Sequence, residues 1–185
     1  LLSEPAETLV GRWAIALGKT YDQAQASQSI GIISAVGRAY GRALQTDAKI
    51  SPINYGGPLV DLNGGILGIL APLSPGEFLQ GDSAQLYDSG IGFAIPLVDL
   101  LDRLPRLQSG EDVRPGKLGI VPSTQNEFAG PVRIVGAMPG SPAAKAGLKA
   151  GDLLLAAQRL DIRILADLRH ALGPVDAGSN FRFSI

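Results

Sequence analysis

Residues 45–64 read QTDAKISPINYGGPLVDLNG, and this stretch decides the fold of the first half of the chain. Asn63 and Gly64 form a strong turn signal, because both residue types tolerate positive φ and fit a type I′ hairpin turn. The runs on either side, residues 59–61 and 66–70, are rich in Leu, Val and Ile. We therefore predict two antiparallel strands joined by a tight turn.

Short β-prone runs separated by Gly, Pro, Asn and Asp extend this pattern in both directions. Residues 9–17, 29–36 and 92–95 are further predicted strands. Apolar residues then switch to helical spacing over 97–104, in a helix opened by Pro96 and ended near Pro105, since proline disfavours helix at the residue before it. With 24 Gly and 13 Pro against five Phe and one Trp, the chain is predicted to be mainly β.

The domain organisation follows from a polar, Gly- and Pro-punctuated stretch at 109–116, which we interpret as a linker. Residues 1–108 are expected to form a β-barrel with a capping helix. Residues 117–185 alternate strands (118–121, 132–135, 153–157 and 181–185) with two short helices, which predicts a small α+β domain. The first of these helices begins at Ser141-Pro142, an N-cap followed by proline at the first helical position.

Composition excludes several functional classes. The net charge of −1, from 16 basic and 17 acidic residues, gives no electrostatic basis for binding nucleic acid or an anionic membrane. With no cysteine, the chain has no disulfide, no thiolate chemistry and no Cys-type zinc site, and we expect neither a metal nor a cofactor. Its apolar runs are too short to span a bilayer.

Because it begins at Leu1 and stops inside a strand-like run, we treat the chain as a fragment.

The first domain resembles the C-terminal β-barrel of the HtrA (DegP-like) trypsin-fold serine proteases. Four stretches carry the resemblance. Residues 13–18 (WAIALG) match the family's strand ending in LAIGNP, residues 29–38 (SIGIISAVGR) match SGIVSALGR, and residues 90–96 match GIGFAIP. Residues 45–64 match the family's nucleophile loop, roughly QTDAxINPGNSGGxLxNxxG. The resemblance implies that Ile91, Gly92 and Phe93 line a degenerate substrate pocket.

The same alignment places Tyr55 at the position of the reactive serine. A phenol with a pKa of about 10 is a weak nucleophile unless an adjacent base activates it. As a base the first domain offers only scattered carboxylates such as Asp47, Asp82 and Asp88, and the chain's one histidine, His170, lies on a helix of the second domain. The family's histidine and aspartate come from an N-terminal barrel that these residues do not include.

The oxyanion loop departs from the family pattern as well. Ile53 replaces a glycine two residues before the nucleophile position, and Asn54 follows it. A β-branched residue resists the positive φ that glycine allows, so we expect the oxyanion-binding N–H to be turned away. We therefore predict a degenerate site in which Tyr55, Ile53 and Asn54 support no catalysis.

The second domain resembles a PDZ domain of the HtrA type. Residues 139–152 (PGSPAAKAGLKAGD) match the signature PxSPAxxAGLxxGD, and residues 117–121 (KLGIV) match the carboxylate-binding loop and its following strand. We expect Leu118, Gly119, Ile120 and Val121 to bind a peptide C-terminus as an added strand, with Leu165 on the opposite wall. Pro122 removes a donor and would shorten that ladder.

These features favour a catalytically inactive HtrA-like pseudoprotease over an enzyme. Its peptide-binding PDZ domain would serve a chaperone or adaptor role in protein quality control. One alternative is an active HtrA-type serine endopeptidase whose triad residues are supplied from outside this chain. Another is a structural subunit of an assembly. The resemblance further implies a periplasmic or other extracytoplasmic location, protein or peptide C-termini as partners, and a possible homo-oligomer.

Overall fold

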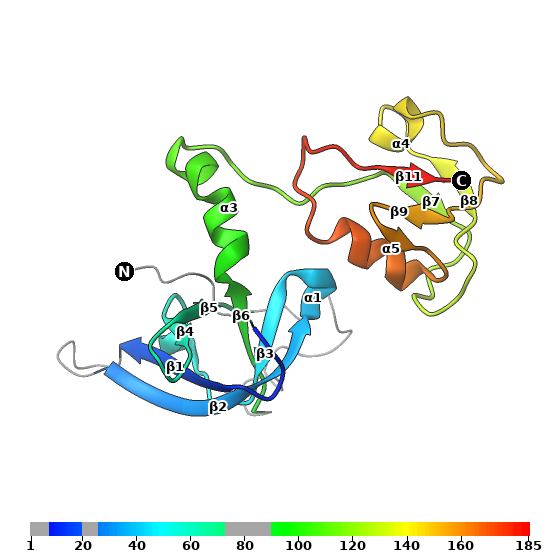
Figure 1. Ribbon diagram of the computed structural model, residues 1–185. Coiled ribbons are helices and arrows are strands. Elements are labelled where there is room, and N and C mark those ends of the chain that lie inside the picture. The colour runs from blue at the N-terminus through cyan, green and yellow to red at the C-terminus, as the bar shows by residue number, and fades with distance from the viewer. Residues whose placement is uncertain (1–7, 20–25, 73–89) are drawn as a thin grey trace. The chain divides into compact units, whose positions relative to one another are not determined.

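The structure is a computed structural model that describes residues 8–19, 26–72 and 90–185. The chain divides into two compact units, Leu1–Glu111 and Asp112–Ile185, and each is described by itself. Figure 1 shows a β-barrel in the first unit and a smaller α+β arrangement in the second. The predicted fold class, mainly β with a trypsin-like barrel, a helix and an α+β domain, is confirmed.

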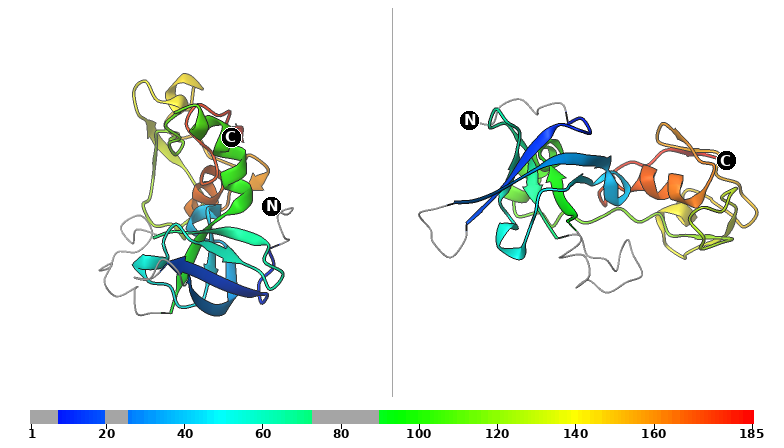
Figure 2. Two further views of the ribbon diagram at one scale, coloured as in Figure 1. Left: turned by 90° about the vertical axis from the view of Figure 1, so that its left-hand side faces the viewer. Right: turned by 90° about the horizontal axis from the view of Figure 1, so that it is seen from below.

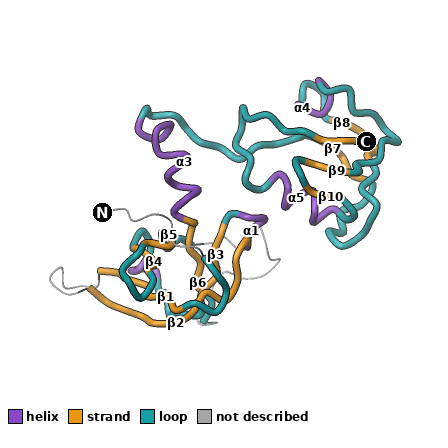
Figure 3. The backbone as a smooth tube through the Cα atoms, viewed as in Figure 1, coloured by secondary structure: helices purple, strands orange, loops and turns teal. Residues whose placement is uncertain are grey.

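The first unit is a closed barrel of six strands in the order β1-β2-β3-β6-β5-β4 (Figures 2 and 3). Every neighbouring pair is antiparallel. The strands are β1 Trp13–Lys19, β2 Ala26–Gly37, β3 Ala43–Thr46, β4 Pro58–Val60, β5 Ile66–Leu70 and β6 Gly92–Pro96. Closure leaves no free sheet edge within these strands, which is how small barrels avoid edge-to-edge association.

Alternation of side chains along the strands fills the barrel. In β1 the buried residues Ala14 and Ala16 alternate with partly exposed Ile15 and Leu17, the period of two that a strand imposes. Small side chains suit the tight interior, which also holds larger residues from the other strands. The barrel core consists of Ala14, Ala16, Ile33, Leu44, Ala48, Leu59, Leu67, Leu70 and Ala94.

The hairpin predicted at Asn63-Gly64 is present, but its turn type is not the predicted one. Strands β4 and β5 pair antiparallel, as expected. Only Gly64 has a positive φ, 82°, whereas a type I′ turn requires one at Asn63 too. The Asp61 carboxylate explains the difference, since its Oδ1 accepts hydrogen bonds from the N–H groups of Asn63 (2.8 Å) and Gly65 (2.7 Å) and organises a longer turn.

Several element limits differ from the prediction. Strand β1 begins at Trp13 and not at residue 9, because the chain turns at Gly11, whose φ is 88°. Strand β3 was not predicted, and the segment α1, Arg38–Gly41, is a turn in which Ala39 and Tyr40 have positive φ.

The helix α3, Leu97–Gln108, runs through Pro105 for one more turn. This last turn is held by the Ser109 hydroxyl, which donates to the Arg106 carbonyl (2.7 Å), and by the Arg106–Glu111 ion pair (2.7 Å).

The second unit contains two small sheets, β7-β8 and β10-β9-β11, with two helices. Ser141 caps α4 as predicted, because its hydroxyl accepts from the Ala144 N–H (3.2 Å). The elements are β7 Ile120–Pro122, β8 Ile134–Ala137, α4 Pro142–Lys145, β9 Ala156–Ala157, β10 Leu160–Asp161, α5 Leu165–Leu172 and β11 Phe183–Ser184.

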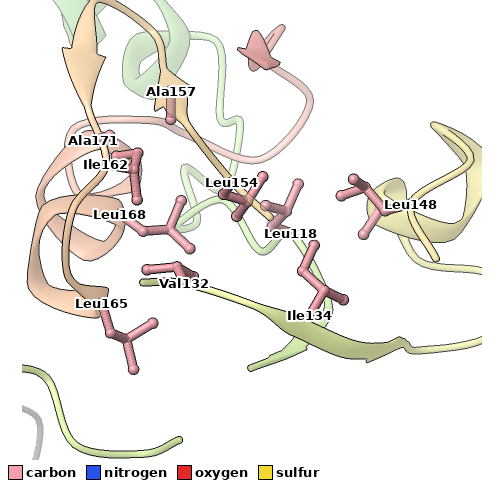
Figure 4. Close-up of a cluster of buried hydrophobic side chains, with 11 residues drawn as sticks. Leu118, Val132, Ile134, Leu148, Leu154, Ala157, Ile162, Leu165, Leu168 and Ala171 are labelled. Atoms are coloured by element: carbon pink, nitrogen blue, oxygen red, sulfur yellow. The ribbon is translucent and has the colours of Figure 1, made fainter. Parts of the chain in front are cut away.

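The core of this unit joins both sheets to both helices (Figure 4). Its buried residues are Leu118, Val132, Ile134, Ala143, Leu148, Leu154, Ala157, Ile162, Leu165, Leu168 and Ala171. The strand predicted at 153–157 is divided between the sheets: Arg133 and Leu153 form an isolated bridge, the Leu154 N–H donates to the Val132 carbonyl (3.0 Å), and only 156–157 belong to β9. The last predicted strand likewise shortens to Phe183–Ser184.

Candidate functional site

The loop that carries Tyr55 begins with a short 3-10 helix, η1, at Pro52–Asn54. Asn54 is 6% exposed, and its side-chain Oδ1 accepts from the Ser51 N–H (3.0 Å) and hydroxyl (3.1 Å). Its Nδ2 donates to the Ser27 hydroxyl at 3.3 Å. Asn54 therefore links the loop to the first residues of β2 by a side-chain hydrogen bond.

The residues that follow are tied to the strand β5. The N–H of Gly56, at a φ of 82°, donates to the Leu70 carbonyl (2.8 Å), and the Leu70 N–H donates back to the Gly57 carbonyl (2.8 Å). Tyr55 has an extended backbone (φ −62°, ψ 137°), and its N–H donates to the Pro52 carbonyl at 3.2 Å. The loop thus has one well-defined conformation with Tyr55 half-buried at its centre.

Ile53 lies within η1, is 44% exposed and does not have a positive φ. The backbone here is compatible with a β-branched residue, since the conformation that would strain it does not occur at this position. The amide of Tyr55 is directed at Pro52 within the turn. The expectation that this loop does not bind an oxyanion therefore stays a prediction.

Of the three carboxylates named above as candidate bases, Asp47 is hydrogen-bonded to the backbone of the barrel. Its Oδ1 accepts from the Ile32 N–H at 2.6 Å, across the pair β2-β3. Asp82 and Asp88 lie outside the described residues. His170 is exposed near the end of α5 in the second unit.

The predicted substrate-pocket residues lie on or beside β6, next to the strand that leads into the Tyr55 loop. Gly92 pairs with Thr46 and Phe93 pairs with Gln45 on β3. A Cβ at Gly92 would collide with the end of the Ile50 side chain, which would have to move. Ile91 is 40% exposed just before the strand. The structure therefore brings 91–93 and 45–46 together in the barrel wall.

In the second unit, the predicted carboxylate-binding loop has a fixed backbone orientation. Gly119 has a φ of 75°, and its carbonyl accepts from the Met138 N–H (2.8 Å) and the Ser141 hydroxyl (3.3 Å). The Leu118 carbonyl accepts from the Ala143 N–H (2.9 Å). Among the described residues, no acceptor takes the N–H of Leu118 or Gly119.

A cavity of about 500 Å³ opens beside this loop, within the second unit. Leu118 is the one predicted peptide-binding residue in its lining, which also includes Lys117, Leu172 and Phe181. Leu165 (4% exposed) belongs to the core, while Ile120 is half-buried and Val121 is 40% exposed on β7. The sequence interpretation missed Phe181, because its alternation marked it only as part of a strand.

Comparison with known protein families gives one match in each of the two units. Residues 1–69 match a family described as a trypsin-like peptidase domain, and residues 133–182 match the PDZ domain family. The chain is 32% identical over its full length to a protein of Pseudomonas fluorescens named "Probable periplasmic serine endoprotease DegP-like". The chain belongs to the HtrA family.

Other relatives and solved structures agree with this assignment. The "Periplasmic serine endoprotease DegP" of Salmonella typhimurium is 34% identical over 95% of this chain. The structure of "HtrA-type protease AlgW with decapeptide" matches 96% of this chain and 56% of its own, with 28% identity and a TM-score of 0.65. A serine endoprotease from Yersinia pestis matches with a TM-score of 0.61, 28% identity and 95% of this chain against 57% of its own.

This chain spans about 40% of the length of the curated HtrA relatives. Within the described residues, no helix is long and apolar enough to cross a membrane.

One functional prediction is corrected by these findings. The sequence interpretation favoured a chain that is not an enzyme, yet the HtrA relatives reported above are named as serine endoproteases. The error came from weighing one position, Tyr55, above a match that extends along the whole chain. The comparisons therefore point to a family of proteases.

Proposed function

We propose that the second unit of this HtrA-family chain binds the C-termini of peptides or unfolded proteins. The proposal takes residues 117–185 as the PDZ domain and 109–116 as the linker that follows the barrel. The terminal carboxylate is received by the N–H groups of Leu118 and Gly119, and the last side chain enters the cavity beside Leu118. The upstream peptide adds to the outer edge of β7 as a short strand.

The backbone geometry around Gly119 is the observation that carries this proposal. Both carbonyls of the loop are turned toward the protein, to the amides of Met138 and Ala143, so the adjacent N–H groups are left for an incoming acceptor. Such converging amides form an anion-binding concavity. The cavity offers Leu118, Leu172 and Phe181 to an apolar side chain, with the cationic Lys117 at its wall.

The comparisons support the same proposal. The structures titled "HtrA-type protease AlgW with decapeptide" and "HtrA-type protease AlgW with tripeptide" match 96% of this chain at 28% and 27% identity. Peptide capture by a PDZ domain is compatible with either an adaptor role or delivery of substrate to a protease. Because the relatives are named as periplasmic, we further propose that the protein works outside the cytoplasm.

Binding is expected to depend on a free peptide carboxylate. A tetrapeptide ending in valine should bind the 185-residue chain, and amidation of its C-terminus should weaken binding at least tenfold, since the amide removes the charge that the loop amides accept. Isothermal titration calorimetry measures both affinities. Equal binding of the acid and the amide would rule out this mode of recognition. No binding of either would favour a structural role for the domain.

We propose second that the longer protein containing this chain is an HtrA-type endopeptidase, as its relatives are named. The single histidine of the chain is in the second unit and Tyr55 stands at the serine position, so the nucleophile, its base and the orienting carboxylate must come from outside these 185 residues. In this arrangement the barrel supplies one wall of the substrate pocket, formed by β3 and β6.

Casein hydrolysis by the full-length protein tests this second proposal. We expect casein to be cleaved and a fluorophosphonate probe to label the protein. Tyr55→Phe, which removes only the phenol hydroxyl, should leave the rate within about twofold. Intact casein would overturn the proposal, and a large loss of rate in Tyr55→Phe would instead assign the hydroxyl to the reaction.

A further inference from the structure

The loop that joins β7 to β8 is fastened to the helix α5 by polar contacts. The Glu127 carboxylate forms an ion pair with the Arg169 guanidinium. Two backbone bonds accompany it: the Ala166 N–H donates to the Glu127 carbonyl (2.9 Å), and the Leu165 N–H donates to the Ala129 carbonyl (3.4 Å). The first turn of α5 is therefore held against residues 127–129, which follow β7 in yellow-green in Figure 1.

The large apolar side chain of this loop contributes little to its attachment to α5. Phe128, the large apolar side chain of the loop, is 81% exposed. The side chains of Glu127 and Arg169 are themselves 32% and 37% exposed, so water and salt reach the pair. Segments with few buried apolar contacts are the ones that open at low cost. We therefore expect residues 127–129 to separate from α5 at a lower cost than the buried core.

The position of the loop matters for the peptide site proposed above, on which this inference rests. A carboxylate at Gly119 fixes the direction of the ligand, whose upstream residues run along β7 toward Pro122. Strand β7 has three residues, and each ligand residue advances about 3.4 Å. The fourth residue from the ligand's C-terminus therefore reaches the end of β7. Beyond β7 the Ser123 N–H still donates to the Arg133 carbonyl (2.8 Å), and the chain continues through residues 124–126 to the contacts of 127–129 with α5.

We propose that the Glu127–Arg169 pair closes the upstream end of the peptide site and sets the length of C-terminal segment that binds. About four ligand residues fit between Gly119 and the loop. A longer ligand must displace residues 127–129 from α5 or leave the surface at Pro122. The pair is thus a determinant of specificity that favours short C-terminal segments.

Two peptides that share their four C-terminal residues, a tetrapeptide and a decapeptide ending in valine, test the proposal by calorimetry on the 185-residue chain. Glu127→Gln removes the charge while keeping the size of the side chain. We expect this variant to bind the decapeptide about fivefold more tightly and the tetrapeptide within twofold of the unmodified chain. Raising the salt concentration screens the ion pair, so it should strengthen decapeptide binding relative to tetrapeptide binding in the unmodified chain. The same change of salt should leave that ratio unaltered in Glu127→Gln.

Asp161→Asn is the matched control, because it breaks an exposed ion pair with Arg163 (3.8 Å) in the same unit and changes the net charge equally. It should leave the ratio unchanged. Arg169→Gln breaks the pair from the other side and should reproduce the Glu127→Gln result. Tetrapeptide binding with an unchanged ratio in both variants would overturn this inference alone. Absence of binding to either peptide would overturn the proposed peptide site and this inference with it.

Discussion

Leu154→Ala is expected to lower the free energy of unfolding of the second unit by about 2 to 5 kcal/mol. Leu154 is fully buried at the centre of the core shown in Figure 4, between Val132, Ile134 and the helix α5. The substitution removes the transfer free energy of the side chain and leaves a cavity that these neighbours fill only in part. Small domains are stable by only about 5 to 15 kcal/mol, so the effect is a large share of the total.

Hydrogen exchange at the amides of Ile134 and Leu154 measures this change directly. Both amides donate across the core, to the carbonyls of Asp152 (2.9 Å) and Val132 (3.0 Å). Leu155→Ala is the control, since Leu155 is the next residue in the chain but is 52% exposed. Its effect should stay below about 1 kcal/mol. Equal losses in the two variants would contradict the assignment of Leu154 to the core.

The barrel was predictable because its strands obey local rules. Strand β5 was predicted with its exact limits, and β4 and β6 within one residue at each end, from apolar runs bounded by turn residues. Strand β3 was missed because Ala43–Thr46 has no β-branched run, and its pairing with β2 and β6 defines it. Pairing with distant strands, and not local propensity, therefore makes Ala43–Thr46 a strand.

The candidate sites were less predictable, for a different physical reason. Sequence resemblance located Gly119 and Tyr55, but hydrogen bonding determines what their backbones present. Asp61 reshaped the hairpin turn through its carboxylate, and Glu127 reached Arg169 across 42 residues of sequence. The Asp61 contact is local, but the prediction from Asn63-Gly64 did not take it into account. The Glu127–Arg169 contact has no local pattern, because it joins a loop to a helix whose position depends on the folded core. The Phe181 contribution to the cavity is hidden for the same reason.

Gly119→Ala is expected to weaken binding of the valine-terminated tetrapeptide at least tenfold. Gly119 has a φ of 75°, which costs an L-residue about 1 to 2 kcal/mol. An added Cβ would also collide with the Cβ of Ser141. Ser141 cannot retreat freely, since its hydroxyl caps α4 and its N–H donates to the Met138 carbonyl (3.0 Å). The loop must therefore shift, which moves the N–H groups of Leu118 and Gly119 out of position for a carboxylate.

Gly140→Ala separates this effect from backbone strain. Gly140 has a φ of 74°, nearly the same as Gly119, but a Cβ there would meet nothing within 4 Å. Both variants therefore lose similar stability from the left-handed backbone, and only Gly119→Ala distorts the loop. Calorimetry should show Gly140→Ala binding the tetrapeptide within about twofold of the unmodified chain, at a temperature where hydrogen exchange reports both variants folded. If Gly119→Ala bound equally well under those conditions, the ligand carboxylate would have to be received elsewhere on the domain.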